Sequence, residues 1–178
     1  MNSTSQYNRI AVALHWLMAV LVILSLLQGT ILLEHTPNSD PEKLSALQGH
    51  ALFGLIIGLL LILRYLNIKL RNKPESANPQ GSRMAWMSSV AHKLIYLLIL
   101  SVVGTGMAMA VEADFASLFA QTITMPESFD DLLTRTAHTI LTKLLILVLL
   151  AHIGAALFHQ FIVKDHLMRR MRWKRFNQ

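Results

Sequence analysis

The stretch His138-Thr-Ile-Leu-Thr-Lys-Leu-Leu-Ile-Leu-Val-Leu-Leu-Ala-His152 places two histidines 14 residues apart in an almost wholly apolar segment. In a helix, at ~1.5 Å and ~100° per residue, the two side chains lie about 21 Å apart on nearly one face. Ionisable side chains within an apolar span are costly and usually functional. The stretch therefore predicts a transmembrane helix that presents imidazoles at two depths.

The rest of the chain has the composition of a membrane protein. Of its 178 residues 53% are hydrophobic and only 15% are charged, whereas soluble domains carry about 25% charged residues. The charges lie between apolar runs, each long enough to cross roughly 30 Å of hydrocarbon. We expect an all-α fold, a single membrane domain of four bundled helices at about 10–33, 47–67, 88–111 and 132–163, followed by a basic tail at 164–178.

Cysteine and charge exclude several functions. The chain has no cysteine, which excludes disulfides, iron–sulfur clusters, thiolate zinc sites and covalently attached c-type haem. The net charge of +6 would suit nucleic acid, but the basic residues flank apolar segments instead of lining a polar face. A membrane protein with basic cytoplasmic segments accounts for the charge better, and no nucleic-acid partner is expected.

The connecting segments differ in charge, which predicts the orientation. The segment between the second and third helices is basic, and so is the tail, whereas the other two segments are acidic. Because basic segments stay in the cytoplasm, both termini and the middle loop are expected there.

The histidines at membrane depth form two pairs. An iron held by two neutral imidazoles needs one histidine on each side of the macrocycle, at equal depth on facing helices. His50 is level with His138 near the outer surface, and His15 is broadly level with His152 near the cytoplasm. The pattern predicts two haems, with these four histidines as the iron ligands. Zinc fits less well, because neither pair has a third ligand, and a lone histidine would more simply be a packing residue.

Five further residues are candidates for contact with a haem or a quinone. Gly29 is level with the outer haem, where a missing side chain would let a porphyrin edge approach. Arg64 is level with the inner haem and would pair with its propionates, or else is a flanking charge. His92 would contact a quinone headgroup or a propionate, or be an interfacial polar residue. Lys143 would snorkel or hold an outer propionate, and His159 competes with His152 as the inner ligand.

Several of these residues belong to motifs that resemble the bacterial cytochrome b(561) family. The resemblance covers the chain from about Ser5 to Arg172, and the order and spacing of its motifs carry it. Lys143 stands where an uncharged residue would be expected. The motifs are His15-Trp16, Gly49-His50, His92-Lys-Leu-Ile-Tyr-Leu-Leu, Thr124-Met125-Pro126 and the series His138, His152, His159.

The resemblance implies a bacterial inner-membrane protein, a four-helix bundle that encloses two haem b groups. Its axial ligands map onto His15, His50, His138 and His152. It also implies electron exchange with the ubiquinone pool of a respiratory chain, and for some members a superoxide:ubiquinone oxidoreductase activity. The alternative is a haem-carrying subunit for a separate dehydrogenase or a periplasmic redox partner. A transporter or anchor would bind no haem.

Overall fold

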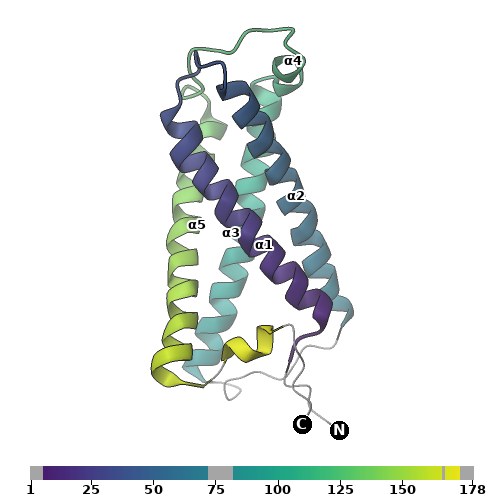
Figure 1. Cartoon of the computed structure of the whole chain (residues 1–178), viewed down its shortest axis with the longest axis vertical. Helices are drawn as coiled ribbons and strands as arrows, with labels where there is room; N and C mark the ends of the chain where they lie inside the picture. Colours follow the sequence, from purple (N-terminus) through teal and green to yellow (C-terminus); the bar gives the residue numbers. More distant parts are fainter. Residues whose placement is uncertain (1–5, 72–81, 166, 173–178) are drawn as a thin grey trace.

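The computed structural model describes residues 6–71, 82–165 and 167–172, and it contains no β-strand within those ranges (Figure 1). Four long helical segments account for most of it. The segments are α1 (Arg9–Leu27) with its π-helical continuation η1 (Gln28–Leu33), α2 (Lys43–Leu70), α3 (Arg83–Glu112), and α5 (Leu133–Phe158) with the π-helical η2 (His159–Val163). Two short helices complete it: α4 (Phe115–Phe119) and the 3₁₀ helix η3 (Leu167–Met171).

The four long segments run along one another as a bundle, with α4 at one end and the start of α1 and the helix η3 at the other (Figure 1). These ends are called the α4 end and the terminal end below. The segments contain 25, 28, 30 and 31 residues, so at ~1.5 Å per residue each is long enough to cross a bilayer core of about 30 Å. The predicted all-α membrane bundle is confirmed, although α2 and α3 begin before the expected positions 47 and 88.

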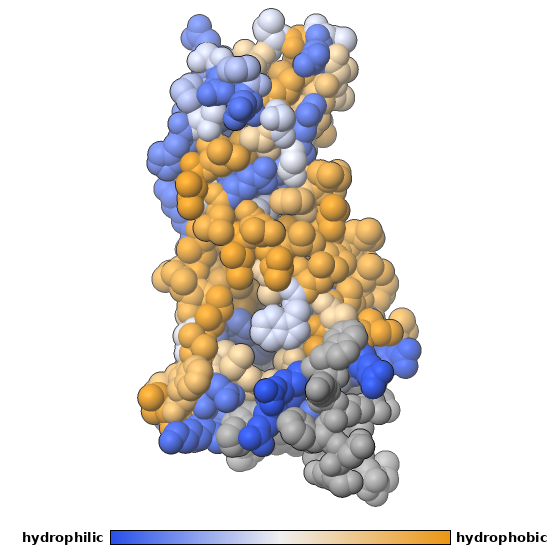
Figure 2. All heavy atoms as spheres, viewed as in Figure 1, coloured by the Kyte–Doolittle hydropathy of each residue, from blue (hydrophilic) through white to orange (hydrophobic). Residues whose placement is uncertain are grey.

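Apolar side chains cover the outside of the bundle as well as its interior. Leu55, Leu97 and Leu147 are each more than half exposed, and Figure 2 shows an apolar band around the middle with polar residues towards both ends. A soluble protein would bury such side chains, whereas in a bilayer they can face the lipid tails, which are equally apolar. At mid-height all four long segments contribute to one buried cluster: Met18, Val22, Ile57, Leu60, Leu61, Leu98, Ile99 and Leu145.

The tail folds back under the bundle at the terminal end. Lys164 adopts a left-handed conformation with φ 58° and turns the chain after η2. The Trp16 indole nitrogen then donates to the Met171 carbonyl at 2.9 Å, and the Tyr7 amide donates to the Arg170 carbonyl at 3.3 Å. The described part of the expected basic tail therefore lies against the start of α1. The middle loop at 72–81 and positions 166 and 173–178 lie outside the described residues.

Candidate cofactor site

The imidazoles of His50 and His138 face each other inside the bundle, towards the α4 end. They come from α2 and α5, and their ring centres are 6.3 Å apart with the planes at 81°. Two nitrogen–metal bonds of about 2 Å each, with roughly 1 Å from each nitrogen to its ring centre, require about 6 Å between ring centres. The pair predicted from the sequence is therefore brought together at a separation that suits an iron between the rings.

Hydrogen bonds orient the His138 ring. Its Nδ1 lies 3.0 Å from the Val102 carbonyl oxygen and 3.2 Å from the Thr105 hydroxyl, both on α3. A carbonyl can only accept, so Nδ1 carries the proton and Nε2 keeps the lone pair that a metal needs. On the other ring, His50 Nδ1 is 3.5 Å from the buried Ser25 hydroxyl of α1. All four long helices thus contribute to this site.

Two glycines leave room for these rings. A Cβ on Gly29 would lie 3.2 Å from Cε1 of His50, and a Cβ on Gly106 would lie 3.3 Å from Cε1 of His138. Both separations are tighter than ordinary van der Waals contact. The sequence indicates Gly29 as a place where a porphyrin edge could approach, and in the structure the His50 ring lies beside it.

A cavity of about 480 Å³ adjoins the pair and reaches the loops at the α4 end. This volume is within the roughly 300–1,000 Å³ typical of cofactor pockets. Its inner part is apolar, with Val22, Ile57 and Ile99 among its walls. Three cationic side chains and three carboxylates also line it: Lys43, Arg135, Lys143, Glu34, Glu127 and Asp130. An apolar pocket with facing imidazoles and cations towards one opening suits a haem, which is a flat apolar ring bearing two carboxylates.

A second group of histidines lies towards the terminal end. His92 of α3 contacts His152 of α5, with ring centres 5.3 Å apart and planes at 81°. His15 of α1 lies near both rings. The structure thus gathers three histidines from three helices, whereas the sequence indicates His15 and His152 as the pair. His92 Nδ1 is 2.6 Å from the Ser88 carbonyl oxygen, which leaves its Nε2 free of the proton.

Arg64 is buried beside this second group. Only 8% of its surface is exposed, its Nη1 donates to the Ala11 carbonyl at 2.9 Å, and its guanidinium carbon is 6.0 Å from the Tyr96 ring centre. A buried cation in an apolar bundle is costly unless an anion completes the site. Such an anion could be a propionate.

His159, the competitor for the second site, is engaged elsewhere. Its Nδ1 lies 2.5 Å from a carboxylate oxygen of Asp165, just beyond the turn at Lys164. Lys143 lines the cavity near His138 with an exposed side chain, but lies about 7.5 Å further along α5, towards the middle of the bundle. Neither residue lies in the ring contacts described above.

Three features of the site could not be identified from the sequence. Gly106 and Thr105 are on α3, for which the sequence predicts no ligand, and the contact between His92 and His152 depends on the rotation of α3. The sequence does show that Gly106 and Thr105 lie at the level of His138. Because it does not show which face of α3 meets α5, it does not assign these two residues to the site.

Comparisons of the sequence with known proteins identify a family. Residues 6–174 match the family model described as prokaryotic cytochrome b561. The chain is 29% identical over 172 residues to the probable superoxide oxidase CybB of Yersinia pestis, covering 93% of this chain and 95% of that protein. It is 22% identical over 175 residues to cytochrome b561 homolog 1 of Escherichia coli K12 (94% and 97%), and 28% identical over 171 residues to cytochrome b562 of Cereibacter sphaeroides (93% and 94%).

The fold and the comparisons together define a multi-pass membrane cytochrome of the b type that works in electron transfer. The chain belongs to the prokaryotic cytochrome b561 family, which implies b-type haem as its cofactor.

The His138 ring lies so close to Gly106 that a larger residue there can be tested against a control substitution on the same helix. In Gly106→Val the added side chain would push the His138 ring from its place, so we expect the purified protein to bind less haem. A Cβ added to Gly104, two residues earlier on α3, would meet nothing within 4 Å, so Gly104→Val should keep its full haem absorbance. Equal haem content in the two variants, measured by visible spectroscopy, would contradict the role given to Gly106.

Proposed function

We propose that this chain transfers electrons from a donor at its α4 end to the ubiquinone pool, with superoxide as the first candidate donor. The observation that carries the proposal is the facing pair His50 and His138, whose separation of 6.3 Å suits a metal between two imidazoles. A haem b in each of two sites would supply reversible one-electron chemistry. The protein contributes the ligands, their orientation and an apolar pocket around them.

We assign the four iron ligands as two pairs. His50 and His138 hold the haem nearest the α4 end, and His15 and His152 hold the haem nearest the terminal end. Arg64 would bind a propionate of the latter haem, since it is a buried cation at that level. His92, in contact with His152, would touch the same haem or a quinone headgroup. Gly29 and Lys143 would border the haem nearest the α4 end.

The proposed orientation follows from charge. The described loops at the α4 end belong to acidic segments, whereas the tail is basic, so we place the terminal end in the cytoplasm of a bacterium and the α4 end outside its inner membrane. In the complete reaction two superoxide ions would each give up one electron and become dioxygen. One ubiquinone would take up both electrons and two protons and become ubiquinol.

A second candidate donor is a basic redox protein, for which this chain would be the membrane haem subunit. The observation in its favour is the charge of the α4 end, where eight carboxylates stand against the two cations Lys43 and Arg135. Such a surface repels an anion at long range and attracts a positively charged protein, and salt weakens both effects. The carboxylates are Glu34, Asp40, Glu42, Glu112, Asp114, Glu127, Asp130 and Asp131.

Assays of the purified protein in detergent can distinguish the two candidate donors. Given superoxide from xanthine oxidase and a soluble ubiquinone analogue, the protein should form ubiquinol, and superoxide dismutase should abolish that formation. His138→Ala, which removes an assigned ligand, should abolish it too. Turnover only with a basic c-type cytochrome as donor, slowing as salt is raised, would favour the second candidate. No electron transfer to quinone from either donor would rule out the proposed function.

The assignment of His152 rather than His159 is tested by a pair of variants. A ligand at His159 would put the two irons about 32 Å apart along α5, more than the ~30 Å hydrocarbon core, against about 21 Å for His152. His152→Ala should therefore lose one haem and keep the other. His159→Ala should keep both, because its imidazole is paired with Asp165. Haem loss in His159→Ala with none in His152→Ala would reverse the assignment.

A further inference from the structure

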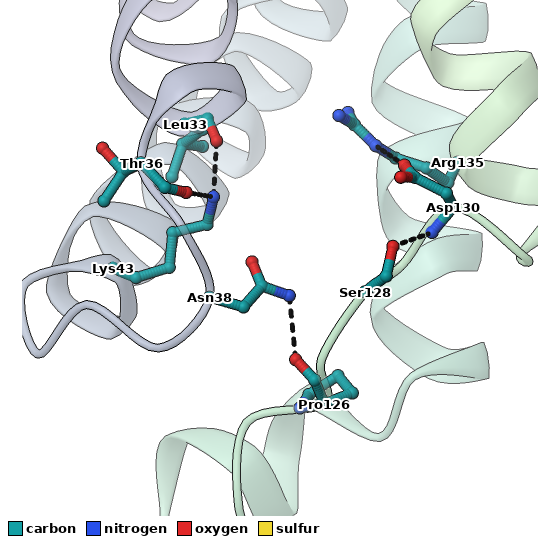
Figure 3. Close-up of polar contacts among 8 residues, drawn as sticks. All are labelled: Leu33, Thr36, Asn38, Lys43, Pro126, Ser128, Asp130 and Arg135. Atoms are coloured by element: carbon teal, nitrogen blue, oxygen red, sulfur yellow. Dashed lines mark hydrogen bonds and ion pairs between the residues drawn. The ribbon is translucent and has the colours of Figure 1, made fainter.

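Two cations line the cavity between the His50–His138 pair and the α4 end, one from each helix that carries a histidine. Lys43 precedes His50 by seven residues on α2, which is nearly two full turns and about 10.5 Å nearer the α4 end. Arg135 precedes His138 by three residues on α5, about one turn nearer the same end. Figure 3 shows the two side chains on opposite sides of one space.

The position of Lys43 is determined by the end of the first helical segment. Its side chain donates to the carbonyls of Leu33 and Thr36, the latter at 2.6 Å, and only 7% of the residue is exposed. An ammonium group has three protons, so these two bonds leave one donor for another acceptor. Across the same space, Asn38 donates to the Pro126 carbonyl at 2.9 Å and joins the two loops of the α4 end (Figure 3).

Within the described ranges, Arg135 leaves most of its hydrogen-bond donors unused. Its ion-pair contact is from Nε to Asp130 at 3.9 Å, beyond hydrogen-bond range, and the Asp130 side chain is 85% exposed. A guanidinium offers five donors in a planar fork that matches a carboxylate.

Two like charges around a largely apolar cavity repel each other, and the burial of Lys43 is costly without an anion; the Arg135 side chain is 33% exposed. The exposed Asp130 compensates little of this cost. Glu34 and Glu127 also line the cavity, but among the described residues neither forms an ion pair with Lys43 or Arg135. In the part of the chain that the structure describes, the cavity therefore presents two cations with spare hydrogen-bond donors and no buried anion paired with either, between the imidazole pair and the α4 end.

We propose that Lys43 and Arg135 each bind one propionate carboxylate of the haem held between His50 and His138. The inference rests on the proposed function, and it adds Lys43 and Arg135 to the residues that bind this haem. It directs the propionates towards the α4 end, which leaves Lys143, on the opposite side of the ring level, without a propionate to bind. Asp130 is then only an exposed partner of Arg135, and the cofactor does not need it.

The test uses the holoprotein with haem labelled by ¹³C in its propionate carboxyls. Redox-induced infrared difference spectra report the propionate bands, and transfer to excess apomyoglobin reports how tightly each haem is held. In Arg135→Gln and Lys43→Gln we expect shifted propionate bands and roughly tenfold faster loss of the haem nearest the α4 end, since a charge-assisted hydrogen bond is lost. The reduction potential of that haem should fall, because the cation stabilises the added electron.

The controls separate propionate binding from a general effect of charge. Lys69→Gln removes an exposed cation from the other end of α2 and should change neither haem, while Arg135→Lys should restore the potential and part of the retention. The haem nearest the terminal end serves as an internal check on folding in every variant. Asp130→Asn should leave retention unchanged.

Two results would overturn the inference. One is unshifted propionate bands in both Arg135→Gln and Lys43→Gln. The other is a band shift in Lys143→Met without one in those two variants, which would turn the propionates towards the middle of the bundle. A wild-type protein that binds no haem would instead refute the proposed function itself.

Discussion

Two imidazoles that face each other from α2 and α5, with ring centres 6.3 Å apart, are the contact on which the rest of the bundle depends. Such a pair leaves polar groups in an apolar interior, where each must be satisfied. The carbonyl of Val102 and the hydroxyl of Thr105 accept or share the His138 proton, and Ser25 approaches His50. These contacts bring residues of all four long helices together at one level.

The two groups of histidines lie at different levels of the bundle. The apolar cluster at mid-height separates the His50–His138 level from the level of His15, His92 and His152. Side chains in the cluster are well packed, whereas a cavity of about 480 Å³ opens beyond it towards the α4 end. Lipid provides no hydrophobic force between helices, so a cofactor that fills such a cavity would itself contribute contacts between them. We therefore expect haem binding and assembly of the bundle to be coupled.

Much of the fold was predictable because its signals are local. Four long apolar runs determine four spans, and the 14-residue interval between His138 and His152 places two histidines on one face of α5 without any knowledge of its neighbours. His50 could be matched to His138 by depth alone, and the structure brings the two together. The sequence did not predict the direction of the tail, because it depends on the left-handed turn at Lys164.

Features that depend on the rotation of a helix about its axis could not be predicted either. Depth matching assigns His15 to His152, but the ring in contact with His152 is that of His92, because α3 turns this histidine towards α5. Periodicity gives each helix its own faces, and only packing decides which faces meet.

The central claim is that two histidine pairs hold two haems, and it is tested most directly by counting them. A pyridine haemochrome assay on the purified protein, with electron paramagnetic resonance of the oxidised form, measures the number, type and ligation of the haems. The account predicts two haem b groups per chain, both low-spin with two imidazole ligands. One haem per chain, no haem, or a high-spin centre at either site would contradict it.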